Sequence, residues 1–119
     1  MKIAVTSQGP HCGSPVDLRF GRAPFFFIVD TETGQQIAVD NAGGAGAVQG
    51  AGTQAAQTLA RRGVQAVVTG HVGPKASTGL QAANIAVYGA TGGTVEEALK
   101  AFMAGQLQRV EGADVRGHW

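Results

Sequence analysis

The 119-residue sequence has little charge, one cysteine and no long apolar run. Only 14% of its residues are charged, and nine basic residues nearly balance eight acidic ones. This balance argues against a nucleic-acid-binding surface. The single cysteine cannot form a disulfide within the chain, no segment approaches the roughly 20 apolar residues that cross a bilayer, and the sequence opens without a signal peptide. We therefore expect a cytoplasmic protein that binds neither nucleic acid nor membrane.

Glycine is in excess: it makes up 19 of the 119 residues, about one in six, whereas an average chain has near 7%. Residues 42–52 (AGGAGAVQGAG) are too rich in glycine for a regular element, so a mobile loop is predicted there. The length and the 44% apolar content fit one domain. We assign that domain to residues 1–105 and expect an irregular tail over 106–119.

Apolar and β-branched runs predict five strands, at residues 2–7, 25–30, 35–40, 64–70 and 85–88. Helices are predicted over 53–62, 74–84 and 95–103, the last with Thr94 and Glu97 as a capping box. A hairpin comes first and β-α-β crossovers follow, and such crossovers are right-handed. The prediction is an α/β fold with a mixed five-stranded sheet in the order 3-2-1-4-5, flanked by helices, with strand 2 antiparallel.

The distribution of charge points to an anion. Between Asp40 and Glu96 the sequence has no carboxylate, although this span contains Arg61, Arg62, His71 and Lys75. Helix N-termini attract negative charge, and glycine lets the backbone approach a ligand closely. Ligands of open α/β sheets sit beyond the carboxyl ends of the strands, which here would gather residues 7–13, 41–52 and 70–75 around one crevice. Alternatively, the glycines only form turns and the cations are solvated.

Other chemistries have weaker support. Gly50, Gly52 and Ala55 match a dinucleotide fingerprint loosely, without a preceding strand or a following acidic residue. His11 and Cys12 are soft candidate metal ligands, but two adjacent ligands do not close a tetrahedral site without His71 or a second molecule. The alternative for Cys12 is an exposed thiol without a role. No pattern pairs a base with a nucleophile, so we do not expect an enzyme.

Five segments together resemble the dinitrogenase iron–molybdenum cofactor biosynthesis family. They are Lys2–Thr6, Pro15–Pro24 with its D-x-R-F-G-R motif, Gly52–Ala56, Thr69–Ala76 with G-x-x-G-P-x-A, and Gly93–Ala98. The resemblance covers nearly the whole chain, to about residue 105. The single-domain form and the opening Thr6–Pro10 are most similar to a subgroup from anaerobic sulfate reducers.

The resemblance implies a ribonuclease H-like fold without nuclease carboxylates. It also implies a cofactor, a noncovalently held molybdenum–copper–sulfide cluster, with an iron–molybdenum cofactor precursor as the alternative. Together with the glycine-rich loop, it gives these candidate binding residues: Arg19, Arg22, Gly43, Gly44, Gly46, Gly50, Gly52, His71, Gly73 and Lys75. Arg19 and Arg22 could instead pair with Asp17 or Asp30 and fix the loop.

Two functions follow from these observations. The first is a non-enzymatic carrier of an anionic metal–sulfide cluster, present as a monomer or weak dimer. The second is an interaction module that acts with a nucleotide-dependent ATPase, as accompanies proteins of this family. A coloured, metal-bearing preparation would favour the carrier.

Overall fold

One six-stranded sheet forms the centre of the computed structural model, which describes residues 1–41 and 50–110. The strands are β1 (Lys2–Ser7), β2 (Phe25–Asp30), β3 (Gln36–Asp40), β4 (Val64–Thr69), β5 (Ala86–Gly89) and β6 (Arg109–Val110). Their order is β3-β2-β1-β4-β5-β6. β1, β4 and β5 are parallel, whereas β2 is antiparallel to both of its neighbours. The predicted order 3-2-1-4-5 with an antiparallel strand 2 is therefore confirmed.

The predicted number of strands was wrong, because a sixth strand lies in the segment expected to be irregular. β6 pairs antiparallel with β5, Val87 opposite Val110 and Tyr88 opposite Arg109. Two residues in a polar stretch carry no alternation that would reveal a strand, and it is the edge of β5 that fixes their conformation. The ribonuclease H-like assignment stays a prediction.

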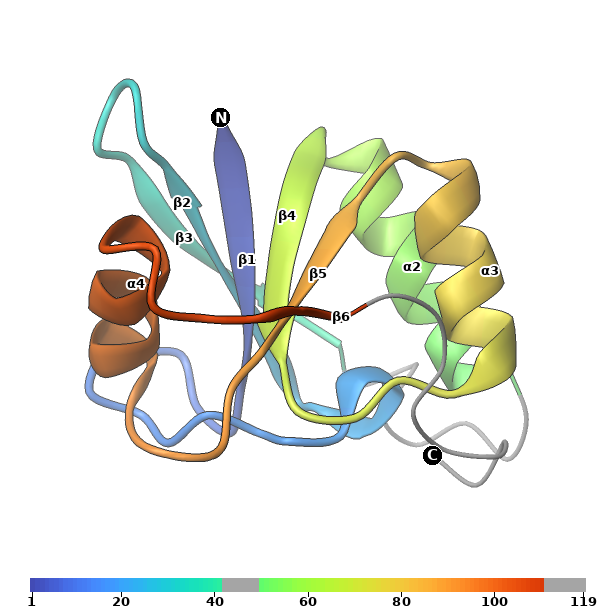
Figure 1. The fold of residues 1–119 in the computed structure, drawn as a ribbon, viewed down its shortest axis with the longest axis horizontal. Helices are drawn as coiled ribbons and strands as arrows, with labels where there is room; N and C mark the ends of the chain where they lie inside the picture. Colours follow the sequence, from blue (N-terminus) through green and yellow to red (C-terminus); the bar gives the residue numbers. More distant parts are fainter. Residues whose placement is uncertain (42–49, 111–119) are drawn as a thin grey trace.

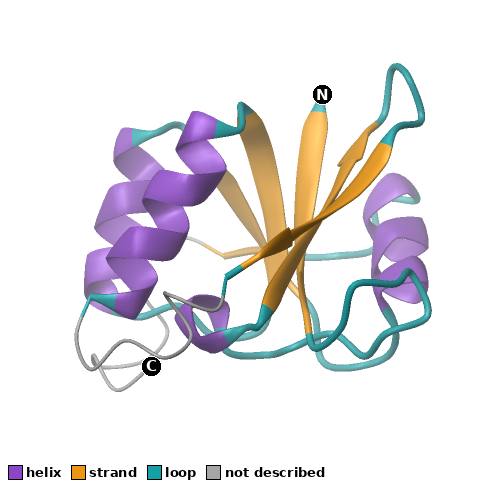
Figure 2. Ribbon diagram, turned by 180° about the vertical axis from the view of Figure 1, so that it is seen from behind, coloured by secondary structure: helices purple, strands orange, loops and turns teal. Residues whose placement is uncertain are grey.

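Helices cover both faces of the sheet. α2 (Ala51–Arg61) and α3 (Pro74–Ala82) lie together on one face, and α4 (Val95–Met103) lies on the other, as Figures 1 and 2 show from opposite sides. In the parts of the chain that the structure describes, no helix has the length and apolar character needed to cross a membrane.

The hydrophobic core has two parts, one on each face of the sheet. Between the sheet and helices α2 and α3 lie fourteen buried residues, among them Phe20, Phe26, Leu59 and Leu80. The smaller part lies under α4 and includes Ile3, Val5, Phe27 and Val95. Alternate residues of β1 therefore enter opposite layers, as expected of a central strand.

Helix α2 begins at Ala51, two residues before the predicted start. Its first turn contains Gly52, which was assigned to the loop but packs against α3. A Cβ on Gly52 would lie 2.8 Å from the Cβ of Ala76, so glycine allows α2 and α3 to approach closely. The glycine-rich loop therefore does not extend to residue 52. A short 3₁₀ helix, η1 (Phe20–Arg22), was not predicted; its Gly21 packs against the first turn of α2.

Candidate functional site

The loops that follow β1 and β4 are joined to each other beyond the carboxyl ends of these strands. The backbone N–H of His71 donates to the carbonyl of Leu18 at 2.7 Å, and the N–H of Phe20 donates to the carbonyl of His71 at 3.1 Å. Arg19 and His71 are thereby paired as in a parallel bridge. Two predicted binding residues that are 52 positions apart in sequence thus lie side by side.

Arg19 contacts a buried carboxylate. Its backbone N–H donates to Oδ1 of Asp17 at 2.9 Å, and its Nε and Nη2 approach Oδ1 and Oδ2 at 3.4 and 3.3 Å. The Asp17 side chain is only 3% exposed, whereas that of Arg19 is 51% exposed. The alternative in which Arg19 pairs with Asp17 is therefore what the structure contains, yet the guanidinium still reaches solvent.

Two buried threonines lie directly beneath this loop. The hydroxyls of Thr6 and Thr69, at the ends of β1 and β4, are 2.8 Å apart, and Thr6 Oγ1 also lies 2.6 Å from the carbonyl oxygen of Asp17. The N–H of Asp17 donates to the carbonyl of Thr6 at 2.8 Å. These bonds fix Asp17 to both central parallel strands.

Helices α2 and α3 begin at the same edge of the molecule, next to η1 (Figure 1). Neither helix has a side-chain N-cap or an acidic residue in its first turn. Lys75, in the first turn of α3, is exposed and has no hydrogen-bond or ion-pair partner among the described residues. The positive ends of two helix dipoles and a lysine therefore meet at this edge, an arrangement that favours an anion.

Close backbone contacts hold this edge together. A Cβ on Gly21 would lie 2.6 Å from the backbone nitrogen of Gly52, and one on Gly70 would lie 2.6 Å from the carbonyl oxygen of Leu18. Real Cβ atoms essentially never come this close. The glycines Gly21 of the D-x-R-F-G-R motif and Gly70 of the G-x-x-G-P-x-A motif thus bring the loop after β1 against α2 and against the loop after β4.

His11 and Cys12 lie on a different part of this end, at the start of α4. The carbonyl oxygens of Cys12 and Ser14 accept the N–H groups of Glu96 and Val95 at 2.8 and 2.9 Å, and Thr94 Oγ1 accepts the N–H of Glu97 at 3.2 Å. The Cys12 thiol is exposed. The first-turn N–H groups of α4 are thus occupied, and α4 carries acidic residues in its first turn, whereas α2 and α3 have none there.

The structure describes most of the predicted site residues. Gly50 and Gly73 are the N-cap residues of α2 and α3, and Arg22 ends η1 half-buried. Gly43, Gly44 and Gly46 lie outside the described residues, as does most of the loop predicted to be mobile. In the described ranges, no group of three or more His, Cys, Asp or Glu residues is arranged to hold a metal ion.

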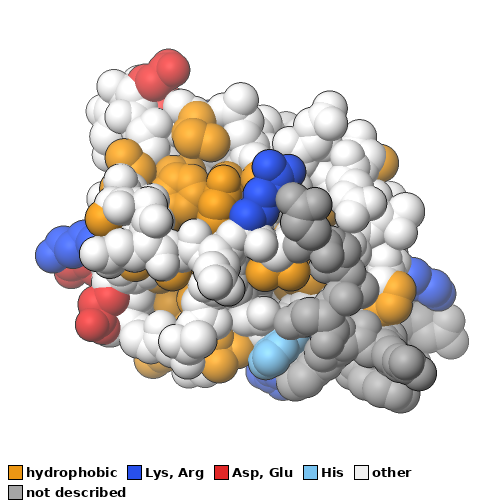
Figure 3. Space-filling model, in the orientation of Figure 1, with side chains coloured by type: hydrophobic (Ala, Val, Ile, Leu, Met, Phe, Trp, Pro, Cys, Tyr) orange, Lys and Arg blue, Asp and Glu red, His pale blue; other side chains and the backbone are white. Residues whose placement is uncertain are grey.

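The visible charges agree with an anion site at this edge. Figure 3 has the orientation of Figure 1 and shows a histidine and a lysine or arginine at the lower edge of the described surface. The acidic side chains seen on this face lie at the left and at the top. Basic side chains also lie at the centre, at the right, and at the left beside acidic ones, so the lower edge differs from the left in that no acidic side chain of the described residues is seen there.

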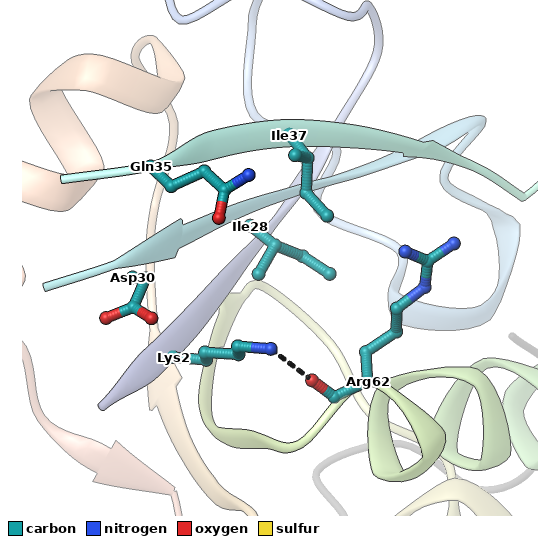
Figure 4. Close-up of a pocket in the computed structure, with 6 residues that line it drawn as sticks. All are labelled: Lys2, Ile28, Asp30, Gln35, Ile37 and Arg62. Atoms are coloured by element: carbon teal, nitrogen blue, oxygen red, sulfur yellow. Dashed lines mark hydrogen bonds between the residues drawn. The ribbon is translucent and has the colours of Figure 1, made fainter. Parts of the chain in front are cut away.

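A small cavity lies at the opposite end of β1 (Figure 4), where Lys2 Nζ donates to the carbonyl oxygen of Arg62 at 3.2 Å. Asp30 lies beside the start of the Lys2 side chain, whose ammonium points away from it toward Arg62. The cavity has about 60 Å³. This is room for about two water molecules and too little for a metal cluster.

The roles of Thr6 and Thr69 were not predicted from the sequence. They are polar residues near the carboxyl ends of two largely apolar strands, and parallel strands bring their carboxyl ends to one edge. A polar residue in the last positions of two such strands is a pattern that could have identified them. Asp17 was recognised only as a partner for an arginine, and its burial could not be read from the sequence.

Known proteins resemble this chain in both sequence and fold. The chain is 43% identical to the orange protein of Desulfovibrio gigas, whose apo structure matches with a TM-score of 0.92 over 96% of both chains. The structure of a putative NifB protein from Thermotoga matches with 38% identity and a TM-score of 0.82 over 91% of both chains. An uncharacterised protein of Methanocaldococcus jannaschii is 32% identical over 93% of this chain and 92% of its own.

The resemblance recognised in the sequence motifs is confirmed at the level of the family. The model of the family described as "Dinitrogenase iron-molybdenum cofactor" matches residues 1–105, which include every described candidate binding residue. The relationship to the orange protein also supports the resemblance to its subgroup. A role in binding a metal cluster is the function that these relationships suggest. The chain belongs to the dinitrogenase iron–molybdenum cofactor family.

Proposed function

We propose that the protein is a non-enzymatic carrier that holds an anionic molybdenum–copper–sulfide cluster without covalent bonds. The cluster would lie at the edge formed by η1 and the first turns of α2 and α3. The observation that carries this proposal is that two helix N-termini, both without a side-chain cap and without acidic residues, meet there beside Arg19, His71 and Lys75.

The donors at this edge fit an anion whose metals already have sulfide ligands. Such a cluster requires positive potential and N–H donors from the protein, rather than thiolates or carboxylates. Arg19 offers a half-exposed guanidinium, Lys75 an exposed ammonium, and the helices their first N–H groups. A bare metal ion would need several converging His, Cys, Asp or Glu side chains, and the described residues contain no group of three.

The test is anaerobic reconstitution of the apo protein with tetrathiomolybdate and copper. Visible spectra and metal analysis after gel filtration then measure how much molybdenum and copper elute with the protein. We expect both metals to be retained at low salt. Retention should fall as ionic strength rises, because salt screens the attraction between exposed charges.

Three variants locate the site. Lys75→Ala should retain less cluster than the wild type, because one cation is removed from the proposed site. Lys100→Ala is the matched control: its side chain is 77% exposed, and it pairs with Glu96 on α4. Cys12→Ala should retain both metals, because Cys12 lies at the start of α4 and not at the edge formed by η1, α2 and α3, and the substitution keeps the carbonyl that bonds to α4.

Three results would change the proposal. Equal losses in Lys75→Ala and Lys100→Ala would mean that only net charge matters and would refute the proposed location. Loss of copper alone in Cys12→Ala would make the thiol a ligand. A wild-type protein that retains no metal would refute the carrier function and direct attention to binding of a partner protein.

A further inference from the structure

We propose that Asp17 is a positioning residue of the anion site: its carboxylate holds the Arg19 guanidinium at the edge where the ligand binds. The inference rests on the proposed function, which it extends to a residue that does not itself face the ligand. Asp17 is the acidic residue of the D-x-R-F-G-R motif, and an acidic residue next to an anion site would otherwise oppose binding.

The geometry ties Arg19 to Asp17 at two levels. The backbone N–H of Arg19 donates to Oδ1 at 2.9 Å, which fixes the turn, while Nε and Nη2 lie 3.4 and 3.3 Å from the two carboxylate oxygens. One edge of the guanidinium therefore faces the carboxylate. Because a guanidinium has five N–H donors, the opposite edge keeps donors for a ligand.

Asp17 is itself held rigidly. Its main chain exchanges bonds with Thr6, whose hydroxyl is 2.8 Å from that of Thr69, and the next residue, Leu18, accepts the N–H of His71 at 2.7 Å. Thr6 and Thr69 are fully buried and Asp17 is 2% exposed. The carboxylate is therefore a fixed point between the two central strands, and Arg19 acquires a defined position although half of its side chain is exposed.

Charge and position predict opposite effects when Asp17 is changed. If the carboxylate acted only through its negative charge, its removal would raise the positive potential and strengthen anion binding. If it positions Arg19, its removal releases a flexible side chain and weakens binding, because the ligand must then order that side chain. The sign of the change in affinity thus separates the two roles.

The experiment titrates each protein with tetrathiomolybdate and copper anaerobically and measures the concentration that gives half-maximal cluster retention. Asp17→Asn keeps the shape of the side chain and removes its charge. Asp30→Asn is the control, because it removes the same charge at the opposite end of β1. We expect roughly a tenfold higher half-maximal concentration for Asp17→Asn, the effect of losing one charged hydrogen bond, and no change for Asp30→Asn.

Two further variants exclude a merely structural effect. In an Arg19→Ala background, Asp17→Asn should weaken retention no further, because its effect acts through Arg19. Asp17→Glu keeps the charge and moves the carboxylate by one methylene, so it should also weaken cluster retention. Circular dichroism identifies which variants fold. If Asp17→Asn does not fold, Asp17→Glu decides the question.

Each outcome has one meaning. Binding by Asp17→Asn as tight as, or tighter than, that of the wild type overturns the inference, as does an equal further loss in the Arg19→Ala background. Wild-type retention by Asp17→Glu overturns it as well. A wild-type protein that retains no cluster refutes the proposed function, and the inference with it, whereas the other failures leave the carrier function intact.

Discussion

Alanine at position 21 would force a methyl group into the backbone of helix α2. Its Cβ would lie 2.6, 2.8 and 2.9 Å from the nitrogen and Cα of Gly52 and the carbonyl carbon of Ala51. Backbone atoms cannot rotate away, so η1 and α2 would have to separate by about 0.8 Å, the difference between 2.6 Å and an ordinary contact of 3.4 Å. Overpacking of this kind costs about 1–3 kcal/mol. Each 1 kcal/mol lowers the melting temperature of a domain of about this size by roughly 4–8 °C.

Gly13→Ala is the matched control for Gly21→Ala. A Cβ at position 13 meets no heavy atom within 4 Å, so the free energy of unfolding of Gly13→Ala should stay within about 0.5 kcal/mol of the wild-type value. Urea unfolding followed by far-UV circular dichroism, together with thermal melts, measures both variants. Equal midpoints for the two variants would refute the argument that the backbone contact between Gly21 and α2 holds this edge together.

Three further predictions concern the rest of the fold. Thr94→Ala removes the hydroxyl that accepts the N–H of Glu97, and urea unfolding should show a loss of about 1 kcal/mol; an unchanged midpoint would speak against the cap. Leu59→Ala opens a cavity at a fully buried position and should cost about 2–5 kcal/mol in the same assay, and a loss below 1 kcal/mol would contradict the packing described. The backbone N–H of Glu32 lowers the pKa of the Asp30 carboxyl below its ordinary 3.8. The contribution of Asp30 to stability is therefore complete above pH 3.8 and is lost as the pH falls through the lower native pKa. An NMR titration of Asp30 with a midpoint at or above 3.8 would disprove this.

The central part of the fold could be predicted because its strands carry local signs. Apolar runs identify β1, β2 and β4, and the handedness of β-α-β crossovers then leaves few arrangements of the sheet. β6 and the start of α2 depend instead on contacts with distant residues. Arg109 and Val110 form a strand by pairing with β5, and Gly52 lies in the first turn of α2 where only glycine leaves room for the Cβ of Ala76.

The candidate site could be predicted in its charge but not in its connections. The lack of carboxylates between Asp40 and Glu96 indicated an anion, and the positions of α2 and α3 agree with that indication. The bridge between Arg19 and His71 and the burial of Asp17 arise from tertiary structure, so no local sequence pattern predicts them. The position of Cys12 could not be predicted either. The loop after β1 is long enough to bring Cys12 to the edge formed by η1, α2 and α3 or to the start of α4, and the structure has it at the start of α4.

The start of α4 is completed by main-chain carbonyl groups of residues 12 and 14, and this separates the stability of the helix from the identity of the side chain at position 12. Every amino acid offers the same carbonyl oxygen, so selection can replace the thiol with a charged, apolar or aromatic group at little cost to the fold. Position 12 of this chain therefore contributes to the start of α4 through its main chain, whatever its side chain is. The fold therefore does not require a cysteine at position 12.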